Sequence, residues 1–464
     1  MKYEIGVYGL GVMGASIAQN ILNHGFSAAV YSKAEEERLH FPSGKYAEAH
    51  PGRCLVCESE KELVQSLQSP RKIFLMITAG APVDSVVETL LPMLEAGDVI
   101  FDGGNSYYKD TDRRCSLCAG KGIHYVGTGV SGGQLGALYG PSIMPGGSYE
   151  GYLAGEKILT TIAAHVEEKP CCAYIGRGGS GHYVKMVHNG IEYAILQLIG
   201  EAYMILRHGL GMAHEEVRKI FQEWRQTKLD SYLIDISVRV MEKYEEDGVP
   251  LIDRILDVAE QKGTGKWTVL EAVERGVYAP GIYEAVMARN FSARVEERRV
   301  GAGLLTVTGD DMKLDDAQAE LGDALLLAIA LSYSQGMELI RKASEDNEWH
   351  IDQKVLADLW RDGCIIRSRL LKDIKAAAEE AKEGPLVLSG AYREFCKSEA
   401  ALRKLVVQTE SAGFACTGFA AALHYYDYYH MQDMPVRFVQ ALRDCFGAHT
   451  YMRTDRPGHF HTEW

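Results

Sequence analysis

The chain has 464 residues, of which 47% are hydrophobic and 24% charged, and its formal net charge is -14. This length exceeds what one hydrophobic core usually organises, and the composition excludes extended disorder, so two or three folded domains are expected. The acidic balance argues against nucleic-acid binding, which needs clustered Lys and Arg. The N-terminus lacks a signal-peptide pattern and no long apolar run is present, so we expect no membrane association and a cytoplasmic location.

Strand and helix patterns alternate in the first part of the chain. A helix is predicted over residues 14–23, and strands are predicted over residues 3–9, 28–31, 72–77, 98–101 and 124–126. Such alternation is typical of an α/β domain in which helices flank a doubly wound, Rossmann-like parallel sheet. We assign this first domain to residues 1–178.

The pattern changes after about residue 178. Apolar residues then recur at spacings of three and four, most clearly over 184–206, 317–344, 353–360 and 413–429. This spacing is helical, so a large all-α domain is predicted over residues 179–440. The last segment, 441–464, is polar and is interrupted by Pro457-Gly458. It cannot form its own core, and we expect either a frayed tail or an arm that docks elsewhere.

A glycine-rich turn joins the first predicted strand to the first predicted helix. It has the pattern G-x-G-x-x-G and consists of Gly9, Leu10, Gly11, Val12, Met13 and Gly14. Glycines allow the backbone to approach a pyrophosphate closely, and the N-terminus of the helix offers it free N–H groups. This context favours a dinucleotide-binding site over a turn that has no ligand.

The end of the second predicted strand indicates which dinucleotide binds. An NAD enzyme usually has Asp or Glu there for the ribose hydroxyls. Here the strand is followed by Ser32, Lys33 and Ala34, and a cation suits the 2′-phosphate of NADP. Three glutamates, at 35–37, follow at once. The pattern favours NADP and leaves NAD possible.

The chain has ten cysteines, and Cys54-Cys57 and Cys115-Cys118 form two C-x-x-C pairs. The gap between the two pairs is much longer than in a zinc ribbon. We therefore expect free thiols and no metal.

The segment 181–193, GHYVKMVHNGIEY, carries polar side chains at a helical spacing. At about 100° per residue, one face of a helix holds all of them: Lys185, His188, Asn189, Glu192 and Tyr193. A solvated face with an ordinary ion pair would have the same spacing. The strongly apolar flanks instead predict a buried polar face, which needs a ligand as partner. A lysine and a glutamate on such a face can serve as base and acid.

This segment resembles the central motif of the 6-phosphogluconate dehydrogenase family. Further stretches resemble the family in the same order along nearly the whole chain: GLGVMG, FDGGNS at 101–106, GVSGG at 129–133, QKGTGKWT at 261–268, WRDGCIIR at 360–367 and RDCFGAHTY at 443–451. The resemblance implies a decarboxylating, NADP-dependent oxidoreductase of the pentose phosphate pathway and gluconate utilisation. It also implies a homodimer in which a C-terminal arm, 441–464, enters the partner's active site.

The resemblance implies a role for each residue that keeps the family's motif. Lys185 resembles the general base that takes a proton from the 3-hydroxyl of 6-phosphogluconate, and Glu192 the acid that protonates carbon 1 after CO2 leaves. The resemblance implies a further substrate-binding set: Asn105, Ser131, Gly132, Gly133, His188 and Asn189 for the sugar acid, Tyr193, Lys262 and Arg289 for its phosphate, and Arg443 and His449 from the arm. Asn105 is also expected beside the cofactor.

The sequence also departs from the family at four places. Ala15 stands where Asn is usual, Thr78 where Lys is usual, and Ser32-Lys33-Ala34 replaces a common Asn-Arg-Thr. The stretch GVYAPGIYEAVMAR at 276–289 also departs, although Arg289 is kept. Two alternative functions are an enzyme of the wider 3-hydroxyacid dehydrogenase group and a non-catalytic dinucleotide-binding paralogue. The first would not need a phosphate clamp, and the second would not need both Lys185 and Glu192, so both are disfavoured.

Overall fold

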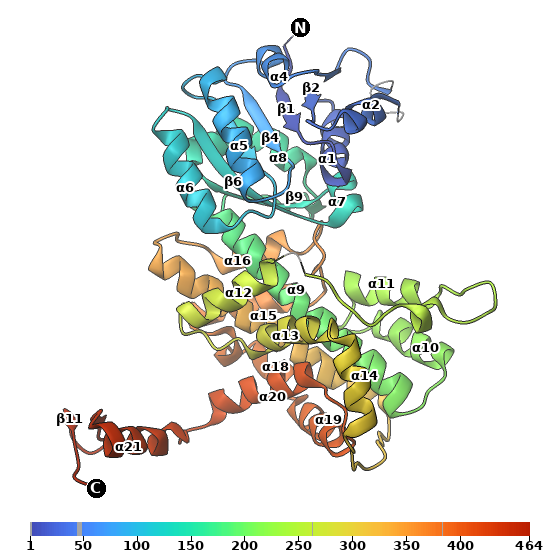
Figure 1. The fold of residues 1–464 in the computed structure, drawn as a ribbon, viewed down its shortest axis with the longest axis vertical. Helices are drawn as coiled ribbons and strands as arrows, with labels where there is room; N and C mark the ends of the chain where they lie inside the picture. The colour runs from blue at the N-terminus through green and yellow to red at the C-terminus, as the bar shows by residue number, and fades with distance from the viewer. Residues whose placement is uncertain (1, 44–48, 262, 383) are drawn as a thin grey trace.

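The N-terminal part of the chain forms a seven-stranded sheet with helices on both sides, and most of the rest is helical (Figure 1). The computed structural model describes residues 2–43, 49–261, 263–382 and 384–464. The predicted fold class, a Rossmann-like sheet followed by a large all-α domain, is confirmed. None of the helices in these described ranges is long and apolar enough to cross a membrane.

The sheet region contains the elements β1 (Ile5–Tyr8), α1 (Val12–Asn23), β2 (Ala28–Tyr31), α2 (Glu35–Ser43), β3 (Cys54–Val56), α4 (Glu60–Ser66), β4 (Lys72–Leu75), α5 (Ala81–Leu90), η1 (Leu91–Met93), β5 (Val99–Asp102), α6 (Tyr108–Ala119), β6 (His124–Ser131), α7 (Gly133–Tyr139), β7 (Ser142–Gly147), α8 (Tyr149–Ile162), β8 (His165–Val166) and β9 (Lys169–Pro170).

The strand order is β3-β2-β1-β4-β5-β6-β7, with β7 antiparallel to β6 and the other neighbours parallel. Strand β1 therefore lies between β2 and β4, which places the turn after β1 where the order reverses. Ligands of doubly wound sheets bind at this point, beyond the carboxyl ends of the strands. The fold thus directs the glycine turn toward a ligand site.

The helical region contains α9 (Ser180–Met204), the π-helical turn η2 (Ile205–Gly209), α10 (His214–Trp224), α11 (Tyr232–Met241), η3 (Leu251–Arg254), α12 (Thr264–Glu274), α13 (Pro280–Ser292), α14 (Val295–Leu304), α15 (Ala317–Asp346), α16 (Gln353–Leu359), α17 (Leu371–Ala381), η4 (Leu386–Leu388), α18 (Tyr392–Cys396), α19 (Glu399–Ser411) and α20 (Thr417–His430).

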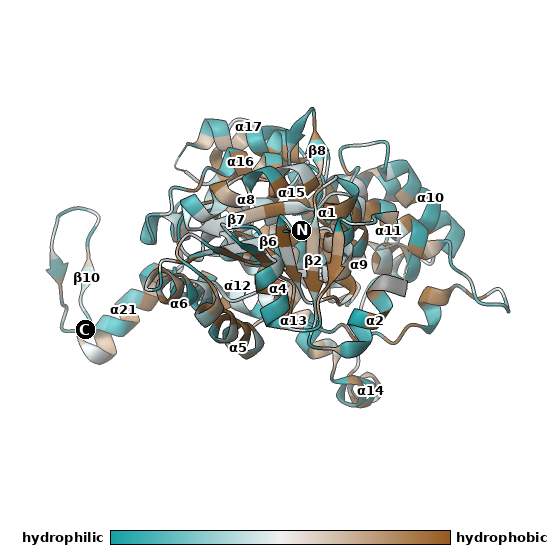
Figure 2. Ribbon diagram, turned by 90° about the horizontal axis from the view of Figure 1, so that it is seen from above, coloured by the Kyte–Doolittle hydropathy of each residue, from teal (hydrophilic) through white to brown (hydrophobic). Residues whose placement is uncertain are grey.

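Helix α9 connects the two regions, because it packs on β6 and β7 at its start and on α12, α13 and α15 further along. Most of its residues are buried, and it belongs to the main hydrophobic core together with α15. In Figure 2 the hydrophobic colour gathers in the middle of the molecule, around the labels β6, β2 and α9, whereas α2 and α10 on the outside are largely hydrophilic.

The predicted strand at 124–126 was too short, and β7 was not predicted. Strand β6 continues through Gly127 and Gly129 to Ser131, and β7 includes Pro145 and two glycines. Glycine and proline usually interrupt strand patterns. Here the glycines are needed because α9 packs directly on the strands. A Cβ at Gly129 would lie 2.6 Å from the Cβ of Lys185.

The C-terminal segment is ordered as α21 (Val436–Gly447) and a hairpin of β10 (Tyr451–Met452) and β11 (His459–Phe460). It extends away from the rest of the chain (Figure 1). The buried Asp444 carboxylate accepts hydrogen bonds from Thr450 N–H at 2.9 Å, Thr462 N–H at 3.0 Å and the Trp464 indole at 2.9 Å. The segment is therefore an arm with its own polar centre, and the predicted start at 441 lies inside α21.

We predict that Gly181→Ala lowers the free energy of unfolding by about 1–3 kcal/mol, the usual cost of forcing extra atoms into a packed core. A Cβ at Gly181 would lie 2.4 Å from the carbonyl oxygens of Gly127 and Met144, which belong to the sheet. Thermal and denaturant unfolding measure the effect.

Gly200→Ala is the matched control on the same helix, because a Cβ there meets no atom within 4 Å. Alanine is the better helix former, so this variant should gain about 0.5–1 kcal/mol. Equal unfolding midpoints for the two variants would contradict the proposed direct contact between helix and sheet.

Candidate active site

The glycine turn forms a backbone cradle at the N-terminus of α1. Gly9 has φ +98°, and a Cβ there would lie 2.4 Å from the carbonyl oxygen of Met76. A Cβ at Gly14 would lie 1.9 Å from the carbonyl oxygen of Gly9. Gly11 caps the helix without a side chain, and its first turn has no acidic residue. The cradle therefore fits the pyrophosphate of a dinucleotide.

The segment after β2 brings both signs of charge to this cradle. Lys33 is exposed. Two charged residues to which no role was assigned from the sequence, Glu37 and Arg38, also lie there. The Ser32 hydroxyl donates to Glu37 Oε2 at 2.5 Å, and the Arg38 guanidinium donates to the carbonyl oxygen of Ser32 at 2.6 Å.

The loop after β5 carries Asn105, which is exposed, and a buried carboxylate holds this loop. Asp102 accepts hydrogen bonds from Gly104 N–H at 3.1 Å, Ser106 Oγ at 2.7 Å and the Tyr125 hydroxyl at 2.8 Å. These bonds fix the backbone on both sides of Asn105. The loop is therefore set by its own strand and by β6, before any ligand binds.

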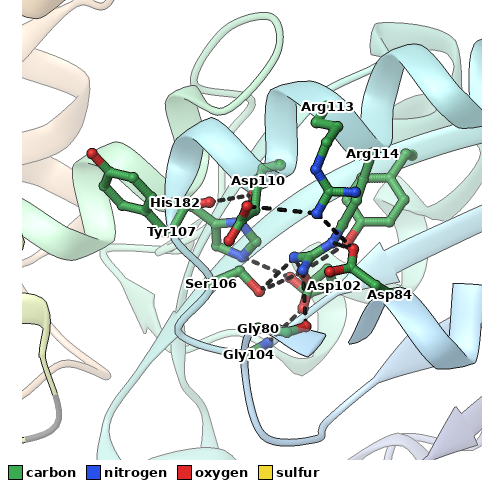
Figure 3. A network of polar contacts seen from close by, with 12 residues as sticks. Gly80, Asp84, Asp102, Gly104, Ser106, Tyr107, Asp110, Arg113, Arg114 and His182 are labelled. Carbon is green, nitrogen blue, oxygen red and sulfur yellow. Dashed lines mark hydrogen bonds and ion pairs between the residues drawn. The ribbon is translucent and has the colours of Figure 1, made fainter. Parts of the chain in front are cut away.

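Figure 3 shows how Arg114 and His182 join the same network. Arg114 is fully buried, with one nitrogen 3.6 Å from Asp102 Oδ2, and it also donates to Asp84 at 2.8 Å. Burial holds the pKa of His182 below its usual value, so the ring is neutral and its Nε2–H donates to the carbonyl oxygen of Asp102 at 3.0 Å. Because His182 lies on the first turn of α9, the loop and the helix share one anchor. No sequence pattern singled out these residues, although Asp102 lies in the FDGGNS motif and His182 in the segment GHYVKMVHNGIEY.

The five polar residues predicted to share a face of α9 do lie on one helix, and Lys185 and Glu192 are electrostatically coupled. Lys185 is 5% exposed, and burial lowers the pKa of its ammonium group, an effect that Glu192 opposes. Burial raises the pKa of Glu192, which the cations of Lys185 and Arg289 oppose. Among the described residues, none hydrogen-bonds the Lys185 ammonium. The lowered pKa of Lys185 favours a neutral base, and the raised pKa of the nearby Glu192 favours a protonated acid.

His188 connects α9 to the end of β6. Its Nε2 lies 3.3 Å from Ser131 Oγ, and its Nδ1 lies 3.1 Å from Asn189 Oδ1. Burial, reinforced by the charge of Lys185, holds the pKa of His188 well below its usual value. Asn189 in turn donates to Thr264 Oγ1 at 3.2 Å. The structure therefore brings these predicted substrate-binding residues together beside Lys185.

The remaining predicted residues of the GVSGG loop are Gly132 and Gly133, with φ of +128° and +62°. A Cβ at Gly132 would lie 2.5 Å from the carbonyl oxygen of Gly363. Gly363 precedes Cys364, which is fully buried and lies near Lys185, and burial raises the pKa of its thiol to about 12. The WRDGCIIR motif thus packs against Gly132 and lies near Lys185, a role that its sequence did not indicate.

The predicted phosphate clamp is only partly visible. The Arg289 guanidinium carbon lies 3.5 Å from the ring centre of Tyr193, in a cation–π contact, and Arg289 also donates to the carbonyl oxygen of Glu260 at 3.4 Å. Lys262 lies outside the described residues. Arg289 therefore remains near the acid end of the α9 face, close to Glu192.

Arg443 and His449 are not brought to this face within one chain. Both are exposed on the arm, where Arg443 donates to Gln440 Oε1 at 3.1 Å and the His449 ring contacts Phe446. Figure 1 shows α21 well away from α9. Their predicted role therefore needs a second copy of the chain.

Comparison with known proteins agrees with the geometry along the whole chain. Residues 4–176 match the family model for the NAD binding domain of 6-phosphogluconate dehydrogenase, and residues 181–464 match that for its C-terminal domain. The NADP(+)-dependent, decarboxylating 6-phosphogluconate dehydrogenase of Bacillus subtilis is 46% identical, and the alignment covers 100% of this chain and 99% of that protein. The decarboxylating enzyme of Haemophilus ducreyi is 45% identical over 100% of this chain and 97% of its own length.

A solved structure extends the likeness to three dimensions. The 6-phosphogluconate dehydrogenase of Plasmodium falciparum, described in apo form and with NADP+ or 6-phosphogluconate, has a TM-score of 0.95 and 39% identity. The match covers 99% of this chain and 100% of that one. With both family models matched in order and relatives matched from end to end, this chain belongs to the 6-phosphogluconate dehydrogenase family.

Proposed function

We propose that the chain oxidises and decarboxylates 6-phosphogluconate to ribulose 5-phosphate and CO2 with NADP as oxidant. The observation that carries this proposal is the pair of the buried Lys185 and the half-buried Glu192, which share one helix face and interact electrostatically. Arg289 and Tyr193 add a cation and an aromatic ring at the acid end, where they suit a phosphate. The relatives named above carry the same activity in their names.

A dinucleotide whose pyrophosphate is held at the glycine turn would supply the nicotinamide that accepts the hydride from carbon 3. Burial lowers the pKa of Lys185, which favours the neutral amine that accepts the proton of the 3-hydroxyl. Its ammonium then stabilises the oxygen of the resulting 3-keto acid while the carboxyl group leaves as CO2. Lys185 returns the proton to that oxygen, which gives an enediol. Glu192 then delivers a proton to carbon 1 of the enediol while Lys185 takes back the hydroxyl proton, which leaves the ketone of ribulose 5-phosphate.

His188, Ser131 and Asn189 hold the polar groups of the sugar acid. Because His188 is buried and neutral, it offers a hydrogen bond without adding charge next to Lys185. The network of Asp102, Arg114 and His182 keeps the Asn105 loop and the α9 start in register. The reacting groups are therefore set in position before the substrate arrives, which is the main contribution of such a site to the rate.

We further propose that the active site is completed in a homodimer, with 1–178 as dinucleotide-binding domain, 179–440 as substrate domain and 441–464 as arm. Helix α21 supports this arrangement through an apolar face that is largely exposed in a single chain. Phe438, Val439, Leu442 and Phe446 are each about half or more exposed and recur at a helical spacing. A second copy that covers this face also receives Arg443, which supplies a cation for its phosphate site.

Purified protein should form reduced cofactor and CO2 in equal amounts from 6-phosphogluconate and NADP. Absorbance of the reduced nicotinamide and trapped CO2 measure the two products. Gluconate without the phosphate is the control substrate, and it should react far more slowly because it leaves Arg289 and its neighbours unpaired. Reduced cofactor without CO2 would contradict the decarboxylating function.

Lys185→Met should remove the oxidation step, because no base remains, and Glu192→Gln should slow turnover by about 10²–10⁴-fold, the usual range for general acid catalysis. Glu192→Gln should also remove one limb of the bell-shaped dependence of kcat on pH, because glutamine does not titrate. Steady-state kinetics across pH test both variants.

Lys219→Met, on an exposed side of α10, serves as control and should behave as wild type. Both active-site variants should retain NADPH binding, since the glycine turn is untouched. An unchanged pH profile in Glu192→Gln would remove this residue from the mechanism.

Arg443→Ala and Lys185→Met proteins, each nearly inactive alone, should regain activity when their subunits exchange. In a mixed dimer, one pocket has an intact Lys185 and receives an intact Arg443 from the other chain. Random exchange of equal amounts should make about half of the dimers mixed, and each mixed two-fold dimer has one complete pocket out of two. About a quarter of wild-type activity should therefore return. Confirmed exchange without any recovery would rule out the shared site.

A further inference from the structure

The Glu37 carboxylate lies over the glycine turn, although Glu37 belongs to α2. Its Oε2 accepts a hydrogen bond from Leu10 N–H at 3.2 Å and another from the Ser32 hydroxyl at 2.5 Å. Its other oxygen, Oε1, lies 3.4 Å from the position that a Cβ at Gly11 would occupy. The carboxylate is therefore held between the turn after β1 and the end of β2, and is not free to turn toward solvent.

This position is the one that reads the adenosine ribose in doubly wound sheets. A carboxylate at the end of the second strand accepts hydrogen bonds from the ribose hydroxyls of NAD, and cations there pair with the 2′-phosphate of NADP. Glu37 supplies the carboxylate from the first turn of α2, the helix that follows the strand end at Tyr31. The strand end itself has Ser32, whose hydroxyl orients that carboxylate.

The cations nearby are only partly available to a phosphate. Arg38 donates to the carbonyl oxygens of Ser32 at 2.6 Å and Lys33 at 3.3 Å, and its guanidinium also lies 3.5 Å from the Glu58 carboxylate. Lys33 is exposed and can reach a ligand. The site therefore has one exposed cation, Lys33, and one carboxylate held in place, Glu37, and their opposite effects on the 2′-phosphate set the affinity for NADP.

We infer that Glu37 is a specificity-determining residue for the adenosine end of the dinucleotide, and that it makes NAD a cofactor of this chain alongside NADP. Its carboxylate accepts hydrogen bonds from the ribose hydroxyls of NAD and repels the 2′-phosphate of NADP, which Lys33 attracts. This inference rests on the proposed function for its biological meaning, but the binding site itself can be tested without turnover.

Fluorescence titration of NADPH and NADH gives the dissociation constants of both ligands for the wild type and for the variants. Glu37→Gln should bind NADPH about tenfold more tightly, because a like charge is removed, and NADH several-fold more weakly. Glu37→Lys should shift the ratio of the two constants further in the same direction. Lys33→Ala should shift it the opposite way, through loss of NADPH affinity alone.

Glu35→Gln is the matched control, because Glu35 is an exposed glutamate on the same turn of α2. Its ratio of dissociation constants should equal that of the wild type. A ratio in Glu37→Gln and Glu37→Lys that stays within about threefold of the wild type, the range of ordinary surface changes, would overturn the inference. That outcome would leave the decarboxylation activity intact. Failure of the proposed function would instead appear as absent turnover with both cofactors, and the ratios of dissociation constants would still test the role of Glu37.

Discussion

The direct contact between the first turn of α9 and strands β6 and β7 is the constraint on which the site depends. Gly127 and Gly129 on β6 and Gly181 on α9 leave no room for a side chain, so backbone meets backbone. Lys185 follows Gly181 by one turn and therefore has a fixed height above the sheet. The distance from the base to anything bound at the carboxyl ends of the strands is a property of this packing.

Burial then determines how the polar face of α9 behaves. Lys185, His188 and Glu192 lie between the sheet and the helical bundle, where desolvation disfavours each charged form. Opposite charges on Lys185 and Glu192 offset part of this effect, as does Arg289. The same packing that places these groups also adjusts their pKa values toward proton transfer.

Local patterns were enough to predict much of this arrangement. The alternation of strands, the glycine turn and the polar face of α9 all depend on short-range periodicity, which the chain shows clearly. Strand β7 escaped prediction because Pro145 and the adjacent glycines indicate a turn, and only pairing with β6 makes them a strand. The place of Glu37 depends on the angle between β2 and α2, and no residue spacing encodes that angle. An arm could be expected from the composition of the C-terminal segment. Its hydrogen bonds to Asp444 could not be predicted, because they come from residues as far along the chain as Trp464.

The continuity of α9 has a consequence for how ligands enter and leave. Many two-domain enzymes close around a ligand by bending at a few hinge residues between the domains. Here the residues between sheet and bundle are the buried start of a long helix, held by His182 and Tyr183, so bending there would break the core. Rigid-body closure is therefore unsuited to this molecule. Ligands must instead enter and leave through movements of peripheral parts, while the two halves stay fixed.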